Sequence, residues 1–376
     1  MRRAAGFLGA LLMMAPGLAA SAAADPAAPG KTVVQPAIDG LFEAFKTYPL
    51  VGLGDVHGLE VEAAFYADLI RDPRFAREVG NVVVEFGASG QQAIIDRYVA
   101  GESVPYVDLR KIWSDTVGWS PPAGIVGYAK FFAAVRAVNK SLPAARRIRV
   151  WLGEPPIDWP TATREQVMAA FNARETYPAS LIASNILAKK KKALVIYGSQ
   201  HFGSDTWLRG RVEAEHPGAF FVVHAYAGNH HPEACAPMLQ QAMSLWPKVA
   251  LASPAAGTAP EAALKQCAAV KSAANMPVVE GEGVLFLSPL GTQTVGAVFP
   301  DYVLDIALRR EMVRRSQIGA VPLIRFPRDY MLVKSDYAFD LEAPGFAQQM
   351  QALFAEYDLS GDGQITADEY LDPIPR

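Results

Sequence analysis

The sequence predicts an α/β fold with a mostly parallel central sheet flanked by helices, and a helical C-terminal extension containing one EF-hand. Near-continuous apolar runs separated by amphipathic segments indicate buried parallel strands joined by helices. Several of these runs end in glycine and ionisable residues, which is where open parallel sheets bind ligands. The chain has 376 residues, 51% of them hydrophobic, which is enough for one large domain or two of ordinary size.

The N-terminus has the pattern of a secretory signal peptide over residues 1–24. Arg2 and Arg3 precede an apolar run, and small residues follow it before Asp25. The run falls short of the ~20 residues that span a bilayer, so we expect a cleaved signal and a periplasmic or secreted protein rather than a membrane anchor. Residues 25–36 are expected to be a Pro-, Ala- and Gly-rich linker. After signal removal we expect no transmembrane segment.

The net charge bears on the class of partner, and the two cysteines bear on disulfide formation. Loss of Arg2 and Arg3 with the signal lowers the formal charge from −3 to about −5, which argues against a nucleic-acid partner. The only cysteines are Cys235 and Cys267, and export would place them in an oxidising compartment. We expect a disulfide between them, although their spacing alone also allows two unpaired thiols.

Periodicity assigns residues 37–330 to the α/β domain. Helices are expected over residues 38–45, 60–70, 90–100, 128–139 and 164–187, the last in two pieces broken at Pro178. Strands are expected over residues 48–53, 82–85, 149–152, 193–197 and 220–224. Residues 229–288 are expected to be helical. The run Lys189 to Lys192 is interpreted as a solvated helix end that complements the helix dipole, with membrane contact as the alternative.

Ionisable side chains follow four of the expected strands. Asp55 and His57 follow the first, Glu85 ends the second, Glu154 ends the third and His201 follows the fourth. Because parallel strands present their carboxyl ends at one edge of the sheet, these groups are expected to converge on one site. No Gly-x-Ser-x-Gly, Gly-x-Gly-x-x-Gly or phosphate-loop motif is present, which argues against a serine nucleophile and a nucleotide cofactor.

The C-terminal segment, residues 343–376, contains an EF-hand loop over residues 358–369. Oxygen ligands stand at loop positions 1, 3, 5, 7, 9 and 12, with glycine at position 6 for the sharp turn. The expected calcium ligands are Asp358, Ser360, Asp362, Gln364 through its backbone carbonyl, Thr366 and Glu369. Because EF-hands usually pair and no second loop is present, this hand is expected to dock on the main domain or to pair with another copy. The alternative is an acidic turn that does not bind calcium.

The motifs around residues 54–58, Glu85, Arg174 and residues 195–201 resemble those of the erythromycin-esterase/ChaN-like (Tiki) superfamily. Members typically show a Gly-Glu-x-His element, a strand-end glutamate, an Arg-acid pair on a helix and a second Gly-x-x-His after a strand. The resemblance covers residues 47–202 in short blocks, and Asp55 stands here in place of the usual glutamate. It implies an α/β core whose members carry out ester hydrolysis, metal-dependent peptidase chemistry or haem and iron handling. The site residues that it implies are Asp55, His57, Glu85, Arg174, Glu175 and His201.

The residue types at this edge allow three kinds of chemistry. In the first, His57 is a general base whose tautomer is fixed by Glu85 or Asp55, and Arg174 holds a substrate anion or the developing oxyanion. In the second, His57, His201 and acids from Asp55, Glu85 or Glu154 hold a divalent transition metal that activates water. In the third, a His or Tyr binds haem without catalysis. The structural alternative is that the histidines are simply hydrogen-bonded and that Glu85 and Glu154 pair with Arg110 or Arg174.

We therefore expect an exported calcium-binding protein that hydrolyses an ester or amide by a histidine- or metal-activated water. The expected catalytic residues are His57, Glu85, Arg174 and His201, and the expected substrate-binding residues are Asp55, Glu154, Arg110 and Glu175. The alternative is a haem-, iron- or metal-binding uptake protein without catalysis. The expected partner at the strand ends is a small-molecule substrate or a haem-like ligand. A third interpretation is a calcium-stabilised interaction module on a degenerate enzyme core.

Overall fold

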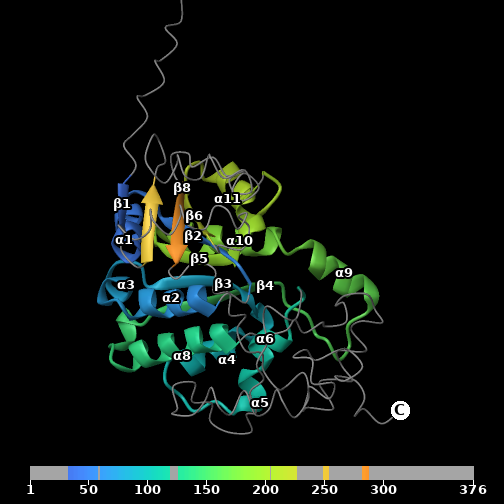
Figure 1. The fold of residues 1–376 in the computed structure, drawn as a ribbon. Helices are drawn as coiled ribbons and strands as arrows, with labels where there is room; N and C mark the ends of the chain where they lie inside the picture. The colour runs from blue at the N-terminus through green and yellow to red at the C-terminus, as the bar shows by residue number, and fades with distance from the viewer. Residues whose placement is uncertain are drawn as a thin grey trace, which may run out of the picture.

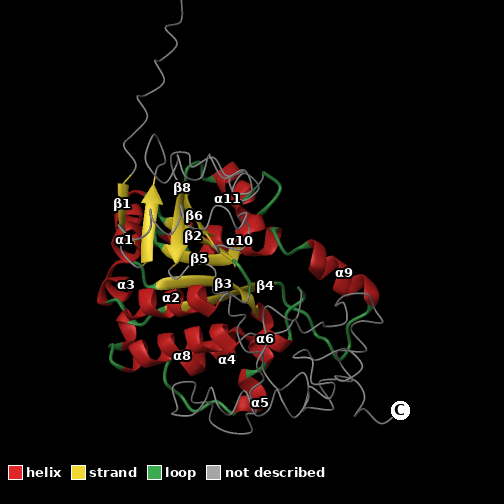
Figure 2. Ribbon diagram, in the orientation of Figure 1, coloured by secondary structure: helices red, strands yellow, loops and turns green. Residues whose placement is uncertain are grey.

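The structure, a computed structural model, describes residues 33–57, 60–118, 126–203, 205–226, 249–253 and 282–287. In this part of the chain a central sheet carries helices on both faces (Figures 1 and 2). The expected α/β fold class is confirmed. No helix within the described residues is both long and apolar enough to span a membrane.

The described strands form one eight-stranded sheet in the order β1-β7-β8-β6-β2-β5-β3-β4. Its strands are β1 (Val33–Pro36), β2 (Leu50–Asp55), β3 (Asn81–Ala88), β4 (Arg149–Glu154), β5 (Ala193–Gly198), β6 (Phe220–Tyr226), β7 (Val249–Ser253) and β8 (Glu282–Leu287). The strands from β8 to β4 pair in parallel, whereas β7 runs antiparallel to both β8 and β1. The mostly parallel sheet that the apolar runs predict is therefore present.

Helical segments connect the strands. They are α1 (Ala37–Thr47), α2 (Glu60–Arg71), α3 (Pro73–Glu78), η1 (Ser89–Gln91), α4 (Gln92–Val99), α5 (Tyr106–Leu109), α6 (Lys111–Ser114), α8 (Val126–Lys140), η2 (Ala144–Arg146), α9 (Arg164–Asn172), α10 (Thr176–Asn185), η3 (Leu187–Lys189), η4 (Ser199–Phe202) and α11 (Leu208–Glu215). The large core contains residues of α1, α2, α3, α4 and α8 on one face, and a second core contains residues of α10 and α11 on the other.

Successive strand residues face alternate cores, as the pleat requires. Val82 and Val84 of β3 belong to the larger core, whereas Val83 between them belongs to the smaller one. In β5, Ile196 and Tyr197 divide in the same way. Both faces are covered, so every position of β2 and β5 is buried. This explains why the strands appear in the sequence as continuous apolar runs rather than as an alternating pattern.

The strand order creates a switch point between β2 and β5. The connection that leaves β2 passes to β3 on one side, whereas the connection that leaves β5 passes to β6 on the other. These connections cover opposite faces of the sheet, with α2 and α3 on one face and α11 on the other. Neighbouring strands whose connections leave to opposite faces have a gap outside their carboxyl ends, and ligands of open α/β sheets bind there. The residues that follow β2 and β5 include His57 and His201, so both lie at this switch point.

Two expectations about irregular regions were wrong where the structure describes them. The linker expected over residues 25–36 ends in a strand, because Val33 to Pro36 pair with β7. Residues 229–288, expected to be helical, contain β7 and β8. Alanine in β7 suggested a helix, but packing decides strand preference, and Leu251 of β7 is completely buried in the sheet core.

The helical segment over residues 164–187 does break, but not at Pro178. α9 ends at Asn172 and α10 begins at Thr176, so the break holds Arg174 and Glu175, which the resemblance placed on a helix. Pro178 lies in the first turn of α10, where a missing backbone N–H costs nothing because it has no intrahelical acceptor. The break therefore frees Arg174 to point toward the sheet.

Several sequence predictions lie outside the described residues. These are the signal peptide over residues 1–24, most of the linker, the disulfide between Cys235 and Cys267, and the EF-hand segment over residues 343–376 with its ligands from Asp358 to Glu369. They stay predictions.

Gly153 of β4 lies against the neighbouring strand β3 and the Tyr197 side chain of β5. A Cβ atom at this position would lie 1.8 Å from the Tyr197 hydroxyl and 2.9 Å from the Val84 carbonyl oxygen. We expect Gly153→Ala to lower the free energy of unfolding by about 1–3 kcal/mol, as overpacking does. Urea denaturation measures the loss. Gly90→Ala is the matched control, because its nearest new neighbour would be 3.7 Å away; an equal loss there would contradict the prediction.

Candidate active site

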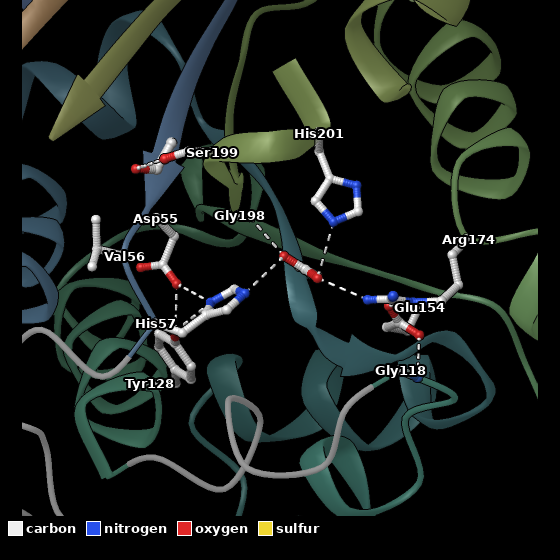
Figure 3. A network of polar contacts seen from close by, with 12 residues as sticks. Asp55, Val56, His57, Gly118, Tyr128, Glu154, Arg174, Gly198, Ser199 and His201 are labelled. Carbon is white, nitrogen blue, oxygen red and sulfur yellow. Dashed lines mark hydrogen bonds and ion pairs between the residues drawn. The ribbon is translucent and has the colours of Figure 1, made fainter. Parts of the chain in front are cut away.

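The ionisable groups predicted at four strand ends do meet at one edge of the sheet (Figure 3). Asp55 ends β2 and His57 follows it, while His201 lies in η4 directly after β5. Glu154 is the last residue of β4, and Glu85 lies within β3. Hydrogen bonds and ion pairs link these groups into one network. Asp55 contacts His57, both histidines contact Glu85, and Arg174 joins Glu85 to Glu154.

A β-bulge positions Glu85. β3 continues to Ala88, so Glu85 does not end the strand as expected. The pairing of β3 with β4 runs to Val84, is interrupted, and resumes at Ala88, leaving the residues between them out of register. A bulge of this kind redirects a side chain that would otherwise follow the pleat. Here the carboxylate reaches β5, where the Gly198 N–H donates to Glu85 Oε2 at 2.7 Å.

Glu85 is the centre of the network. Its Oε1 accepts a hydrogen bond from Arg174 Nη2 at 2.8 Å and lies 3.2 Å from His201 Nε2. Its Oε2 lies 3.9 Å from His57 Nε2, on the other side. Burial alone would raise the pKa of Glu85, but the hydrogen bond with His201 and the charges of His57 and Arg174 hold it well below its ordinary value. Glu85 is therefore an ionised carboxylate throughout the physiological range.

Arg174 bridges Glu85 to a second buried acid. Its Nε donates to Glu154 Oε1 at 2.7 Å, and the Gly118 N–H donates to Glu154 Oε2 at 2.9 Å. Burial raises the pKa of Glu154, and the charge of Arg174 offsets only part of that rise. A Cβ atom on Gly118 would lie 2.5 Å from Arg174 Nη2, so a glycine is needed for this close approach.

These contacts bear on the role expected for Arg174. The sequence interpretation had its guanidinium hold a substrate anion, whereas two of its nitrogens already contact Glu85 and Glu154. The structural alternative, in which Glu85 and Glu154 pair with Arg174, describes what is present. Arg110, the other candidate partner, precedes α6, a short helix that packs on β3.

Asp55 and His57 form a pair on the other side of Glu85. Asp55 Oδ2 lies 2.7 Å from His57 Nδ1, and the side chain of Asp55 is only 4% exposed. Tyr66 of α2 donates to Asp55 Oδ1 at 2.7 Å, and Tyr128 of α8 donates to Oδ2. Asp55 is thus held by two neutral hydroxyls, which leave its negative charge to act on His57.

His57 has the most exposed side chain of the network. Its side chain is 32% exposed, whereas that of His201 is 8% exposed. Burial lowers the pKa of His57, but the hydrogen bond with Asp55 and the charge of Glu85 outweigh this and raise it to about 8. Because Nδ1 contacts Asp55, Nε2 is the nitrogen that gains and loses a proton. A side chain on Gly198 would meet His57, since a Cβ there would lie 3.0 Å from Nε2.

His201 is enclosed on all sides. Its Nδ1 lies 2.8 Å from Glu175 Oε1 and its Nε2 contacts Glu85, while the rings of Tyr197 and Trp207 pack edge-on against it. Burial lowers its pKa, but Glu175 and Glu85 outweigh burial and raise it to about 9. His201 is therefore an imidazolium at neutral pH, and it acts on Glu85 rather than on solvent.

Sequence reasoning missed three residues of this site: Tyr66, Tyr128 and Glu62. Glu62 is 1% exposed and accepts the Val56 N–H at 2.9 Å, which fixes the backbone between Asp55 and His57. Burial and the charge of Asp55 raise the pKa of Glu62 well above its ordinary value. A buried tyrosine on an amphipathic helix needs a hydrogen-bond partner for its hydroxyl, so the sequence indicated that such partners exist. The spacing of the residues does not show which groups they are.

The donor set bears on the metal and haem interpretations. Among the described residues, no three His, Cys, Asp or Glu side chains are grouped so that they would hold a metal ion. Both nitrogens of His201 face carboxylates, and Arg174 places a cation between Glu85 and Glu154. These contacts fit an ion-pair network and do not fit a metal held jointly by His57 and His201. The same contacts leave His201 no nitrogen for haem iron.

Comparison with protein-family models, with curated proteins and with solved structures finds no match for this chain. The resemblance to the erythromycin-esterase/ChaN-like superfamily therefore stays a prediction, and the site is interpreted from its own geometry.

The two histidines predict how stability depends on pH. Their pKa values of about 8 and about 9 lie above the ordinary 6.5, so each stabilises the fold while protonated. Their contribution is complete below about pH 6.5 and is lost as pH rises through 8 for His57 and 9 for His201. Urea denaturation from pH 6 to 10 measures this loss. We expect His57→Gln to remove its earlier part and His201→Gln its later part; unchanged curves in both variants would contradict the assignment.

Proposed function

We propose that this edge of the sheet is an active site that hydrolyses an ester or amide, with His57 as the general base for the attacking water. The pair of His57 with buried Asp55 carries the proposal, because a carboxylate on Nδ1 orients the ring and leaves Nε2 for proton transfer. His57 is also the histidine of the network with a solvent-exposed side chain, which gives it access to water and substrate.

The proposed reaction returns His57 to its starting state. The water oxygen adds to the substrate carbonyl carbon while one water proton passes to Nε2 of His57. When the tetrahedral intermediate collapses, His57 gives a proton to the leaving alcohol or amine, and the carboxylic acid is released. Asp55 and Glu85 stabilise the imidazolium between these steps, which is the same effect that raises the pKa of His57 to about 8.

Glu85 supports this chemistry as a fixed negative charge. Its pKa is held too low for it to carry a proton near neutral pH, so it does not compete with His57 for the proton of water. Arg174 and His201 keep it ionised and in place by contacts at 2.8 and 3.2 Å. In this proposal Arg174 and His201 are positioning residues that act through Glu85. Substrate binding by Glu154 and Glu175 is not part of it, because Glu154 contacts Arg174 and Gly118, and Glu175 contacts His201.

The sequence supports two further parts of the proposal, export and calcium binding. The pattern of residues 1–24 supports export to the periplasm or beyond, and the loop over residues 358–369 supports one structural calcium ion. A single exported hand with few carboxylates fits weak structural binding better than signalling.

The activity test uses a panel of p-nitrophenyl esters and anilides as probes. We expect kcat/KM to rise with pH and to level off above pH 8, because His57 must be neutral to accept a proton. His57→Ala should lower kcat/KM by about 10²- to 10⁴-fold, the usual contribution of a general base. Stopped assays from pH 6 to 10 measure both effects.

His216→Ala is the matched control, because His216 lies on the connection from α11 to β6, at the opposite edge of the sheet. It should keep wild-type turnover. Activity that survives in folded His57→Ala would reject His57 as the base. Absence of turnover on the whole panel, together with a haem absorption band that is lost in His57→Ala, would favour the uptake protein instead.

Calcium binding is tested by calorimetry on the mature chain. We expect one ion per chain in the wild type and none in Asp358→Ala, since position 1 supplies an essential carboxylate. Asp340→Ala, upstream of the EF-hand segment, is the control for loss of one acidic residue. Equal binding by wild type and Asp358→Ala would identify the loop as an acidic turn that does not fill.

A further inference from the structure

The opposite edge of the sheet holds an open hollow of about 630 Å³. It is lined by the residues that precede β2, β5 and β6, so it lies at the amino ends of these strands. β2 spans 6 residues. At ~3.3 Å per residue, the hollow lies roughly 20 Å from the site around His57. It is therefore a separate place on the molecule, and a ligand bound there would not depend on the proposed hydrolysis.

Lysines from two distant parts of the chain meet at this hollow. Lys46 comes from the last turn of α1, and Lys190, Lys191 and Lys192 come from the turn before β5. Apolar side chains, among them Tyr48 and Leu187, line the remaining wall. Glu215 is the one carboxylate among the described lining residues. We call this place the basic hollow.

The three consecutive lysines contact no acidic partner among the residues that the structure describes. In the part of the chain that the structure describes, no ion pair joins Lys190, Lys191 or Lys192 to a carboxylate. Exposed arginines on the same molecule are paired, with Arg97 at 2.9 Å from Glu102 and Arg149 at 3.2 Å from Asp96. Among the described residues, the basic hollow thus holds three lysines without an ion-pair partner, whereas Lys46 pairs with Glu43 at 2.6 Å.

Lys190 holds its place at a conformational cost. Its φ of 52° and ψ of 37° are left-handed, and the other described residues with positive φ are the glycines Gly80, Gly101 and Gly218. A glycine would make this turn with less strain, because the left-handed region disfavours residues with a Cβ. The left-handed turn ends the helix, because the Lys190 N–H donates to the Leu187 carbonyl at 2.9 Å and the Lys191 N–H donates to the Ile186 carbonyl at 3.0 Å. The turn explains the conformation but not the choice of a lysine at this position.

Complementing the helix dipole explains only part of this arrangement. Cations after η3 do interact favourably with its carboxyl end. The capping turn accounts for the left-handed conformation of Lys190, but a glycine would serve that turn with less strain. Neither effect gives a reason for Lys46, from a different helix, to line the same hollow as Lys190 to Lys192.

We propose that the basic hollow binds a phosphate group carried by a small apolar molecule. Four of the residues that line the hollow are lysines, which together supply positive charge for a dianion, and lysine binds phosphate as a point charge. The volume of about 630 Å³ exceeds what a bare phosphate fills and lies within the range of small-molecule sites. Tyr48 and Leu187 supply the apolar contact for the rest of the ligand.

The test is calorimetric titration of the whole mature chain with phenyl phosphate, inorganic phosphate and phenol. We expect phenyl phosphate to bind more tightly than either of the others and to weaken as salt is added. Lys191→Gln/Lys192→Gln should lower its affinity at least tenfold. Lys140→Gln/Arg146→Gln removes the same charge from exposed positions outside the hollow and should leave the affinity unchanged.

Lys190→Gly separates binding from folding. We expect this variant to melt at a higher temperature than wild type, because it relieves the left-handed strain, and yet to bind phenyl phosphate more weakly. Co-sedimentation with phosphatidylcholine vesicles, with and without phosphatidylglycerol, distinguishes the source of the phosphate. Lysine-dependent binding to the anionic vesicles alone would assign the site to a lipid headgroup. Saturable binding of phenyl phosphate alone would assign it to a soluble ligand.

Two results would overturn the proposal. One is the absence of binding to phenyl phosphate and to anionic vesicles alike. The other is an equal loss of affinity in Lys191→Gln/Lys192→Gln and Lys140→Gln/Arg146→Gln, which would show attraction to the overall charge rather than to the basic hollow. If inorganic phosphate bound as tightly as phenyl phosphate, the ligand would need no apolar part, and that part of the proposal would be wrong.

Discussion

The ionised carboxylate of Glu85 is the constraint on which the candidate site depends. A buried negative charge is costly unless hydrogen bonds and opposite charges surround it, and Glu85 receives them from Gly198, Arg174 and His201. Each of these three groups is held in place by its contact with Glu85. The bulge in β3, the break between α9 and α10 and the turn after β5 are the backbone irregularities that bring carboxylate and donors together. The regular sheet holds these irregular parts in place.

The two acids next to His57, Glu85 and Asp55, are stabilised in different ways. Glu85 contacts the cations Arg174 and His201, which keep it ionised. Asp55 is held by the hydroxyls of Tyr66 and Tyr128, which orient it without cancelling its charge. His57 therefore takes its orientation from Asp55 and part of its raised pKa from each acid. His201 is enclosed and contacts a carboxylate at each nitrogen, so it has no nitrogen left for proton exchange with solvent. His57 differs from it in having an exposed side chain.

Much of the fold was readable in the sequence because burial of both sheet faces leaves long apolar runs, and β2, β3, β4 and β5 all carry them. The convergence of His57, Glu85, Glu154 and His201 followed from one rule about parallel strands. The strand order, the bulge at Glu85 and the hydroxyl partners of Asp55 could not be predicted, because they depend on contacts between residues far apart in the chain. β7 was missed for a related reason: five residues with two alanines carry little intrinsic preference, and the neighbouring strand decides their conformation.

The same long-range contacts have a consequence for the order in which the protein folds. The partners of Glu85 lie 89, 113 and 116 residues away along the chain. Closing loops of this length is entropically costly, so contacts of this kind form after the local helices and hairpin-range contacts. We accordingly expect the network around Glu85 to assemble late, after β3, β5 and the turn holding Arg174 have docked. A partly folded chain would hold His57 and Asp55, which are neighbours in sequence, yet lack the charge environment that Glu85 provides. In the proposed mechanism, a partly folded chain would therefore lack part of the charge that raises the pKa of His57.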